Sequence, residues 1–213
     1  MSGAPPRDAR YFVSDIPEGR SGDWSLERFV VSEDPSYDPQ KDPRPHFARR
    51  YAGTFSLLRR GDVQFMTDLY DEWWTQRVVL DEAAARGGHL LISGLGLGMI
   101  VESVLRSPGM DVESITVIEK SPDVIRLVAP TLTARYPERL EIVEADVFRW
   151  TPPDGRRYSV AWHDIWPSPY DVESETDALR RRYAPWADWI GTWPEEHRDA
   201  YRGMGKEASA PSV

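Results

Sequence analysis

Residues 89–105, HLLISGLGLGMIVESVL, constrain the fold most, because a strand pattern, a glycine turn and an apolar helix pattern follow one another directly. The next apolar stretch, ITVIE, ends on Glu119, which lies 21 positions after Gly98 (119 − 98). In α/β proteins, a strand, a glycine turn, a helix and a second strand that ends on an acid hold a nucleoside. The glycines allow close approach of the backbone, the helix offers free N–H groups, and the acid binds the ribose hydroxyls. We therefore expect an α/β fold with a nucleoside site.

The alternation of strands and helices continues through most of the chain. The pattern predicts strands at 89–93, 114–119, 140–146 and 158–165, and helices at 71–88, 99–106, 121–132 and 171–183. Strands that alternate with helices of this length predict a parallel, doubly wound sheet. Ahead of them, two strand-like runs at 54–60 and 63–67 flank a glycine-containing turn, which predicts a β-hairpin.

These patterns divide the chain into four regions. Residues 1–47 are an arm rich in proline and aspartate that could act as a lid, with strand-like alternation only at 24–33. Residues 48–80 hold the hairpin and the start of a connecting helix, and 81–184 hold the nucleoside-binding domain. Residues 185–213 are a tryptophan-rich segment with a frayed tail and room for one more strand or helix. The expected fold class is α/β, a doubly wound and mostly parallel sheet with an N-terminal β-hairpin and a short C-terminal region.

Composition excludes several kinds of function. The formal net charge of −9 argues against a nucleic acid as the main partner, because phosphates require a basic surface. The chain has no cysteine, and its four histidines show no metal-ligand spacing, so no metal is expected. No apolar run reaches the ~20 residues of a membrane helix, and the N-terminus lacks a signal-peptide core. We expect a cytoplasmic protein without a membrane partner.

The glycine turn resembles that of the class I S-adenosylmethionine (SAM) dependent methyltransferase superfamily. Gly94, Gly96 and Gly98 form G-x-G-x-G, the spacing common there, whereas dinucleotide enzymes favour G-x-G-x-x-G. The resemblance implies a Rossmann-like fold that binds SAM as co-substrate or substrate. It also implies that Glu119 holds the ribose and that Asp146, at the end of EIVEAD, contacts the adenine amine.

Within this superfamily the chain is similar to the spermidine-synthase branch. LLRRGDVQFMTDLYDE at 57–72 resembles the segment that follows the hairpin there, and Gln64 keeps its place in it. YSVAWHD at 158–164 resembles Y-D-V-x-x-x-D, which implies that Asp164 is the base for an attacking amine.

Departures from both patterns leave the reaction open. Leu97 replaces an aspartate of the spermidine synthases, but it stays a predicted cofactor contact as part of the turn. Ile92 stands where most methyltransferases carry the acid that holds the SAM ammonium. The methionine end must then be held by other residues, and Gln64, Asp68 and Asp164 are the candidates.

The end of the fourth strand supplies the catalytic candidates. A carboxylate there faces the ligand crevice of a doubly wound sheet, so Asp164 is predicted as the base rather than as a loop cap. Trp166 and Tyr170 follow it, and an aromatic face stabilises a sulfonium cation by about 0.5–2 kcal/mol. We predict Tyr170 as a catalytic residue. Trp166 can either line the cofactor pocket or pack elsewhere, and alternation places Trp162 in the core.

The sequence thus predicts a SAM-dependent transferase, most simply a methyltransferase that acts on a small molecule. One alternative is attack on the γ-carbon of SAM, which releases methylthioadenosine. The nucleophile would be another amine or that of SAM itself, which would close an azetidine ring. A second alternative is a non-catalytic SAM-binding protein. The glycine spacing disfavours a nicotinamide dehydrogenase, and an exposed hairpin strand with a tryptophan-rich tail is compatible with a homodimer.

Overall fold

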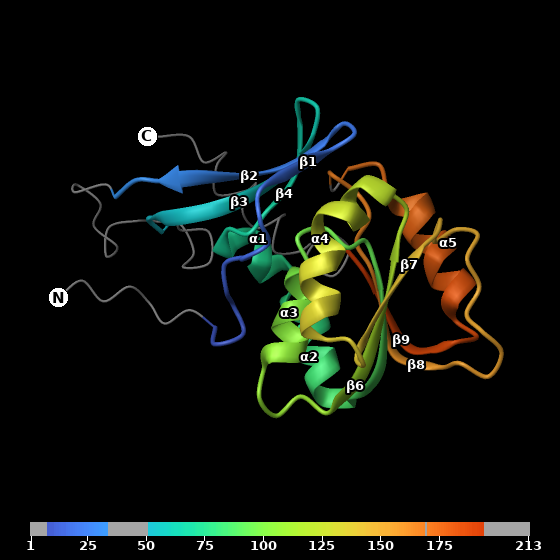
Figure 1. Cartoon of the computed structure of the whole chain (residues 1–213). Helices are drawn as coiled ribbons and strands as arrows, with labels where there is room; N and C mark the ends of the chain where they lie inside the picture. Colours follow the sequence, from blue (N-terminus) through green and yellow to red (C-terminus); the bar gives the residue numbers. More distant parts are fainter. Residues whose placement is uncertain (1–7, 34–50, 169, 194–213) are drawn as a thin grey trace, which may run out of the picture.

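Two sheets make up the framework of the protein (Figure 1). The structure, a computed structural model, describes residues 8–33, 51–168 and 170–193. One sheet is antiparallel, with the order β1-β2-β3-β4, and comprises β1 (Gly19–Ser21), β2 (Trp24–Val31), β3 (Gly53–Arg60) and β4 (Val63–Thr67). The other is parallel, with the order β7-β6-β5-β8-β9, and comprises β5 (Gly88–Ser93), β6 (Val112–Glu119), β7 (Leu140–Glu144), β8 (Tyr158–His163) and β9 (Ala187–Thr192). The helices are α1 (Tyr70–Thr75), α2 (Arg77–Arg86), α3 (Met99–Arg106), α4 (Pro122–Arg135) and α5 (Glu173–Tyr183).

Helices cover both faces of the parallel sheet. Side chains alternate between the faces along each strand, so Leu90 and Ile92 of β5 belong to one apolar cluster while Leu91 belongs to another. The first cluster includes residues of α2, α3 and α4, and the second includes residues of α5. Figure 1 shows the same division, with α5 on the opposite side of the sheet from the other three. The predicted α/β class with a doubly wound parallel sheet is confirmed.

Local sequence signals explain where α4 begins and where α2 ends. The Ser121 hydroxyl accepts the N–H of Val124 (3.3 Å), and Pro122 opens α4, as the capping pattern predicts. Gly87, with φ +60°, follows the last residue of α2. No helix in the described part of the chain is long and apolar enough to span a membrane.

The single helix predicted at 71–88 is wrong, because the structure has two helices, α1 and α2, that meet at Gln76. Gln76 is buried, and its side chain hydrogen-bonds Trp162 and Asp164 of the parallel sheet. The spacing of apolar residues predicts one continuous helix. It does not reveal that Gln76 must reach Trp162 and Asp164, which are distant in the sequence. The break is therefore tied to the site described below.

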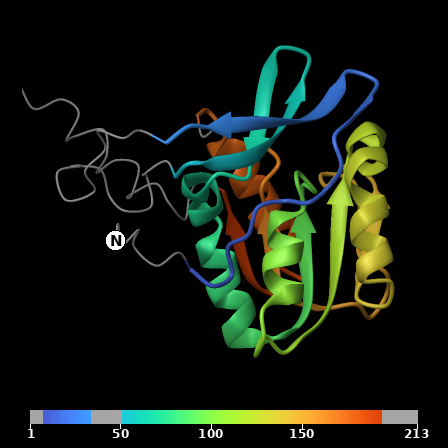
Figure 2. The same ribbon diagram turned by 60° about the vertical axis from the view of Figure 1, so that its left-hand side comes forward.

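The N-terminal region contributes more regular structure than the alternation at 24–33 indicated. Both β1 and β2 join the predicted hairpin, and Leu26 of β2 pairs with Leu58 of β3. Figure 2 shows this antiparallel sheet lying across the ends toward which the parallel strands point. The segments 1–7 and 34–50 lie outside the described residues, so the lid stays a prediction. The C-terminal segment adds β9 beside β8, and residues 194–213, with the predicted frayed tail, also lie outside the described part.

Asp68 joins the N-terminal segment to the antiparallel sheet. Its carboxylate is buried and accepts the N–H groups of Ser56 (2.7 Å) and Ser14 (2.8 Å), and its carbonyl accepts the Tyr11 hydroxyl (2.9 Å). Burial raises the pKa of this carboxyl, and its hydrogen bonds oppose that rise. Asp68 is buried and does not line the cavity described below, so the cofactor contact suggested by the sequence gains no support from its position.

Replacing Asp68 with alanine should lower the free energy of unfolding by about 2–4 kcal/mol, because two buried N–H groups lose their acceptors. Urea denaturation would measure the change. The matched control is Asp188→Ala, which removes an exposed carboxylate paired with Arg157 and should cost less than about 1 kcal/mol. Equal losses for the two variants would contradict the role given to Asp68.

Candidate active site

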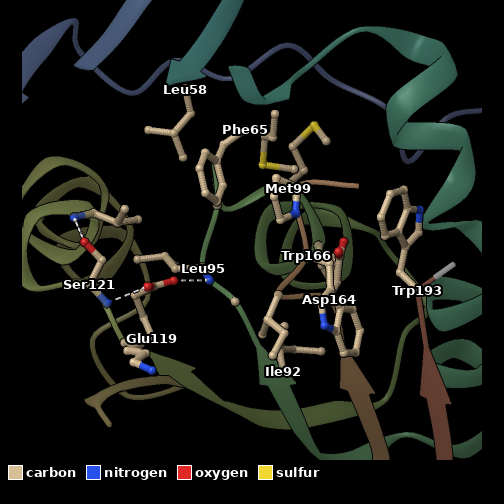
Figure 3. A pocket seen from close by; sticks show the side chains of 18 of the residues that line it. Leu58, Phe65, Ile92, Leu95, Met99, Glu119, Ser121, Asp164, Trp166 and Trp193 are labelled. Atoms are coloured by element: carbon tan, nitrogen blue, oxygen red, sulfur yellow. Dashed lines mark hydrogen bonds between the residues drawn. The ribbon is translucent and has the colours of Figure 1, made fainter. Parts of the chain in front are cut away.

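A cavity of about 960 Å³ lies between the two sheets (Figure 3). It opens at the carboxyl ends of β5, β6 and β8, where the strand order reverses between β5 and β8. Open α/β sheets bind ligands at such a switch point. The structure brings many of the predicted site residues into its lining: Gln64, Gly94, Gly96, Glu119, Asp146, Asp164 and Trp166.

Glu119, at the end of β6, connects the glycine turn to the start of α4. Its carboxylate accepts the N–H of Leu95 (2.9 Å) through one oxygen and the N–H of Ser121 (2.7 Å) through the other. Burial raises the pKa of this carboxyl, and the backbone N–H groups oppose that rise. A carboxylate oxygen has two lone pairs, so each oxygen can still accept a hydrogen bond from a ligand hydroxyl. Its position suits the predicted contact with a ribose.

Asp146 lies at the same end of the cavity, after β7. Its carboxylate accepts hydrogen bonds from the ammonium of Lys120 (3.0 Å) and from the backbone N–H of Phe148 (3.0 Å). The Lys120 hydrogen bond and that of Phe148 lower the pKa of Asp146, which favours its ionised form. Phe148 also lines the cavity, so an aromatic ring and a hydrogen-bond acceptor are available together for a flat base.

Each glycine of the turn allows close packing against a different element. Gly94 has φ +94°, and a side chain there would overlap the carbonyl oxygen of Asp164. Gly98 has φ +71°, and a Cβ there would lie 2.6 Å from Leu132 of α4. Gly98 does not line the cavity. Packing against α4 explains why this position has no side chain. The predicted contact of Gly98 with the cofactor therefore gains no support from the geometry.

Gly96 packs against the antiparallel sheet. With φ +50°, it lies against Met66 of β4 so closely that any side chain would overlap the Met66 sulfur. The same sulfur accepts the N–H of Leu97 at 3.0 Å. Leu97 is buried and does not line the cavity, so its side chain is a packing residue, and the predicted cofactor contact of Leu97 is not supported.

Asp164 stands at the opposite end of the cavity, directly after β8. The Gln76 amide donates to its carboxylate (2.7 Å) and accepts the indole N–H of Trp162 (3.0 Å). Burial raises the pKa of Asp164 to about 7, and the Gln76 hydrogen bond only partly opposes this. A carboxyl with a pKa near neutrality can take up and release a proton under ordinary conditions.

A second carboxyl at this end, Glu72 of α1, was missed in the sequence. It accepts the N–H (2.8 Å) and the hydroxyl of Thr67. Burial raises its pKa to about 8, and the negative charges of Asp164 and Asp71 contribute in the same direction. The acidic run after β4 was visible in the sequence. Which of its acids faces the cavity depends on where α1 begins, and that could not be read from the pattern.

Aromatic residues behave as predicted in only part of the site. Trp162 is fully buried in the core and stacks on Trp189, with 6.3 Å between ring centroids. Trp166 lines the cavity, as does Trp193, which the sequence did not single out. Tyr170 is 77% exposed and is not part of the cavity lining, so its predicted catalytic role gains no support.

His163 points away from the cavity into the other face of the sheet. It is fully buried, its Nδ1 lies 2.8 Å from the Ser93 hydroxyl, and burial lowers its pKa to about 3. A neutral, buried histidine of this kind is structural. Across residues 8–33, 51–168 and 170–193, no group of three or more potential ligands is arranged to hold a metal ion.

Comparisons with known proteins give similar structures but no family. No family model matches the chain, and no curated protein matches it. Similar solved structures include the 23S rRNA methyltransferase ErmE (22% identity over 58% of this chain and 48% of that chain, TM-score 0.38). Others are the [4+2]-cyclase SpnF (21%, 57% and 44%, TM-score 0.45) and protein arginine methyltransferase 10 of Arabidopsis thaliana (15%, 63% and 42%, TM-score 0.42). The matched part spans less than half of each of these three chains.

The two ends of the cavity should respond to pH with opposite signs. The pKa of Asp164 is about 7 in the folded protein, against 3.8 ordinarily, so wild-type stability should fall as pH rises from about 4 to 7. Asp164→Asn removes this cost, so its free energy of unfolding should exceed that of wild type by on the order of 4 kcal/mol at pH 8, at about 1.4 kcal/mol per pKa unit. The difference should vanish near pH 4, as measured by urea denaturation across this range.

Asp146→Asn is the matched control of opposite sign. The pKa of Asp146 is lowered in the folded protein, so its ionised form stabilises the fold above its ordinary pKa. This variant should therefore be less stable than wild type at pH 7, and the difference should shrink as pH falls below about 4. The same pH dependence in both variants would contradict the assigned electrostatics.

Proposed function

We propose that this chain is a SAM-dependent transferase that acts on a small molecule, most simply as a methyltransferase. The observation that supports this best is the placement of Glu119 and Asp164. They follow β6 and β8, the two neighbours of β5, and both line the one cavity that the glycine turn also lines. Glu119 can bind a nucleoside at one end of the cavity, and Asp164 can take up a proton at the other. This arrangement suits a nucleoside that carries a reactive group.

The residues present fit SAM. Glu119 can accept the ribose hydroxyls, and Asp146 with Phe148 can hold the adenine. When bound, SAM supplies an electrophilic carbon next to a sulfonium, and transfer requires proximity and a deprotonated nucleophile. Asp164 is the group that can take the nucleophile's proton, and the indole of Trp166 can face the cation. Ligand pockets range over ~300–1,000 Å³, and this one, at about 960 Å³, has room for an acceptor as well.

The charge of the site favours a small acceptor over a nucleic acid. Acidic residues dominate the charged lining, and the basic residues there are Arg60 and Lys120, of which Lys120 is paired with Asp146. A phosphate backbone would meet repulsion at such a surface. The net charge of −9 acts in the same direction.

A second candidate reaction is attack on the γ-carbon, which would release methylthioadenosine. The observation that favours it is the apolar cavity floor at Ile92, which is 1% exposed and offers no carboxylate to an ammonium. An amine that is not held as a cation can act as a nucleophile, either in an acceptor or in SAM itself.

Product analysis should separate these reactions. The purified protein would be incubated with SAM alone and with candidate acceptors, and the products identified by mass spectrometry. Methyl transfer is expected to yield S-adenosylhomocysteine, whereas attack on the γ-carbon would yield methylthioadenosine. Binding of SAM without either product, unchanged in the Asp164→Asn variant, would instead establish a non-catalytic binding protein.

The nucleoside site can be tested without turnover. Replacing Glu119 with glutamine keeps its size but removes its charge, and should weaken SAM binding by about 10-fold or more by calorimetry, because hydrogen bonds to a charged group are worth ~1.5–3 kcal/mol. The control is Glu144→Gln, which changes the exposed register partner of Glu119 in β7 and should leave affinity unchanged. Unaltered affinity in the Glu119 variant would refute the assigned ribose contact.

A further inference from the structure

The end of the cavity next to Asp164 is walled by tryptophans. Trp74 comes from α1, Trp166 from the segment after β8, and Trp193 from the residue after β9. Figure 3 shows Trp166 and Trp193 beside Asp164, across the cavity from Glu119. Three separate elements therefore bring indole rings to the place where an acceptor would meet the reactive carbon.

Contacts with neighbouring side chains and backbone hold these rings in place. The Trp193 indole N–H donates to the Thr75 hydroxyl (3.2 Å), and its backbone N–H donates to the His163 carbonyl (2.9 Å). The Trp166 indole N–H donates to the Glu175 carboxylate. Trp74 carries the Arg77 guanidinium 4.7 Å from its ring centroid. Aromatic walls that are fixed before a ligand binds lower the entropic cost of binding.

The ionisable side chains that line this end of the cavity are all carboxyl groups, and the Arg77 guanidinium beside Trp74 is not part of the lining. Glu72 and Asp164 are close enough that the charge of one raises the pKa of the other, and Asp71 adds a further negative charge. The basic residues of the lining are Arg60, at the end of β3, and Lys120, directly after β6. Indole faces together with carboxylates form a favourable environment for an organic cation.

We propose that the acceptor is an organic amine with a flat, apolar body, whose ammonium lies between Glu72 and Asp164 and whose body packs on Trp74, Trp166 and Trp193. This substrate class rests on the proposed transferase function. A linear polyamine, with cations spaced along a thin aliphatic chain, would leave most of the indole surface without a partner. Glu72 is thereby assigned as a specificity residue beside the base.

The reaction balances with the groups at hand. The ammonium gives one proton to the Asp164 carboxylate, and the freed lone pair of the nitrogen forms a bond to the transferred carbon. The bond from this carbon to sulfur breaks, its electron pair stays on sulfur as a neutral thioether, and the positive charge passes to the product amine. Asp164 then returns its proton to solvent.

Calorimetry on the protein loaded with S-adenosylhomocysteine tests this assignment without turnover. The probes are 2-phenylethylamine, its uncharged counterpart 2-phenylethanol, and 1,4-diaminobutane. The aromatic amine should bind about 10-fold or more tightly than either of the other two, because it alone satisfies both the carboxylates and the indoles. S-adenosylhomocysteine affinity, measured first in every variant, reports whether the nucleoside site is intact.

Matched variants separate the two parts of the proposal. Trp193→Leu should weaken 2-phenylethylamine by about 10-fold, and Trp193→Phe should restore most of the affinity, with S-adenosylhomocysteine binding unchanged in both. Glu72→Gln should weaken the amine without affecting 2-phenylethanol. Trp150→Phe, which packs against the second core outside the cavity, should leave all affinities at the wild-type level.

Each opposite result would overturn a definite statement. If 1,4-diaminobutane binds more tightly than 2-phenylethylamine, the acceptor is an aliphatic polyamine. If 2-phenylethanol binds as tightly as 2-phenylethylamine, the carboxylates do not distinguish a charged ligand from an uncharged one. If S-adenosylhomocysteine binds and none of the probes does, the acceptor class is wrong and the nucleoside site stands. If S-adenosylhomocysteine itself does not bind, the proposed function fails, and the acceptor class fails with it.

Discussion

The contact between Met66 and the glycine turn is the constraint on which the site depends. Gly96 lacks a side chain, so the antiparallel sheet can lie on the carboxyl end of the parallel sheet, with the Met66 sulfur on the Leu97 N–H. This contact joins the roof of the crevice to the glycine turn at the switch point. The glycine turn therefore serves to join two sheets as well as to admit a ligand.

The parallel sheet places the chemical groups on either side of this contact. Because β6 and β8 are both hydrogen-bonded to β5, the residues that end them, Glu119 and Asp164, reach the same cavity from opposite sides. Their surroundings differ in a useful way. Glu119 is bound by two backbone N–H groups, whereas Asp164 receives a single amide and is raised in pKa to about 7. One carboxyl is fixed for binding and the other is free to exchange a proton.

Much of this arrangement could be predicted because it depends on local patterns. From β5 to α4 strands alternate with helices, and this run includes a glycine turn and a capping serine. Its elements could therefore be predicted from the sequence, as could the positions of Glu119 and Asp164 at strand ends that face the cavity. The break at Gln76, the inward position of Glu72 and the burial of Asp68 depend on contacts between distant segments, which no periodicity encodes. The same limit explains why Leu97 and Tyr170 were counted as site residues: each follows a strand that ends at the cavity, but neither lines it.

Amide hydrogen exchange with and without saturating SAM tests the central claim most directly. If the cavity between the two sheets is the SAM site, protection from exchange should rise at the Leu95 and Ser121 amides, which donate hydrogen bonds to Glu119. It should also rise along β4, which forms the roof of the cavity. The edge strand β1, which does not line the cavity, should change little. SAM binding that leaves these amides unprotected, or protects a different region instead, would contradict the account.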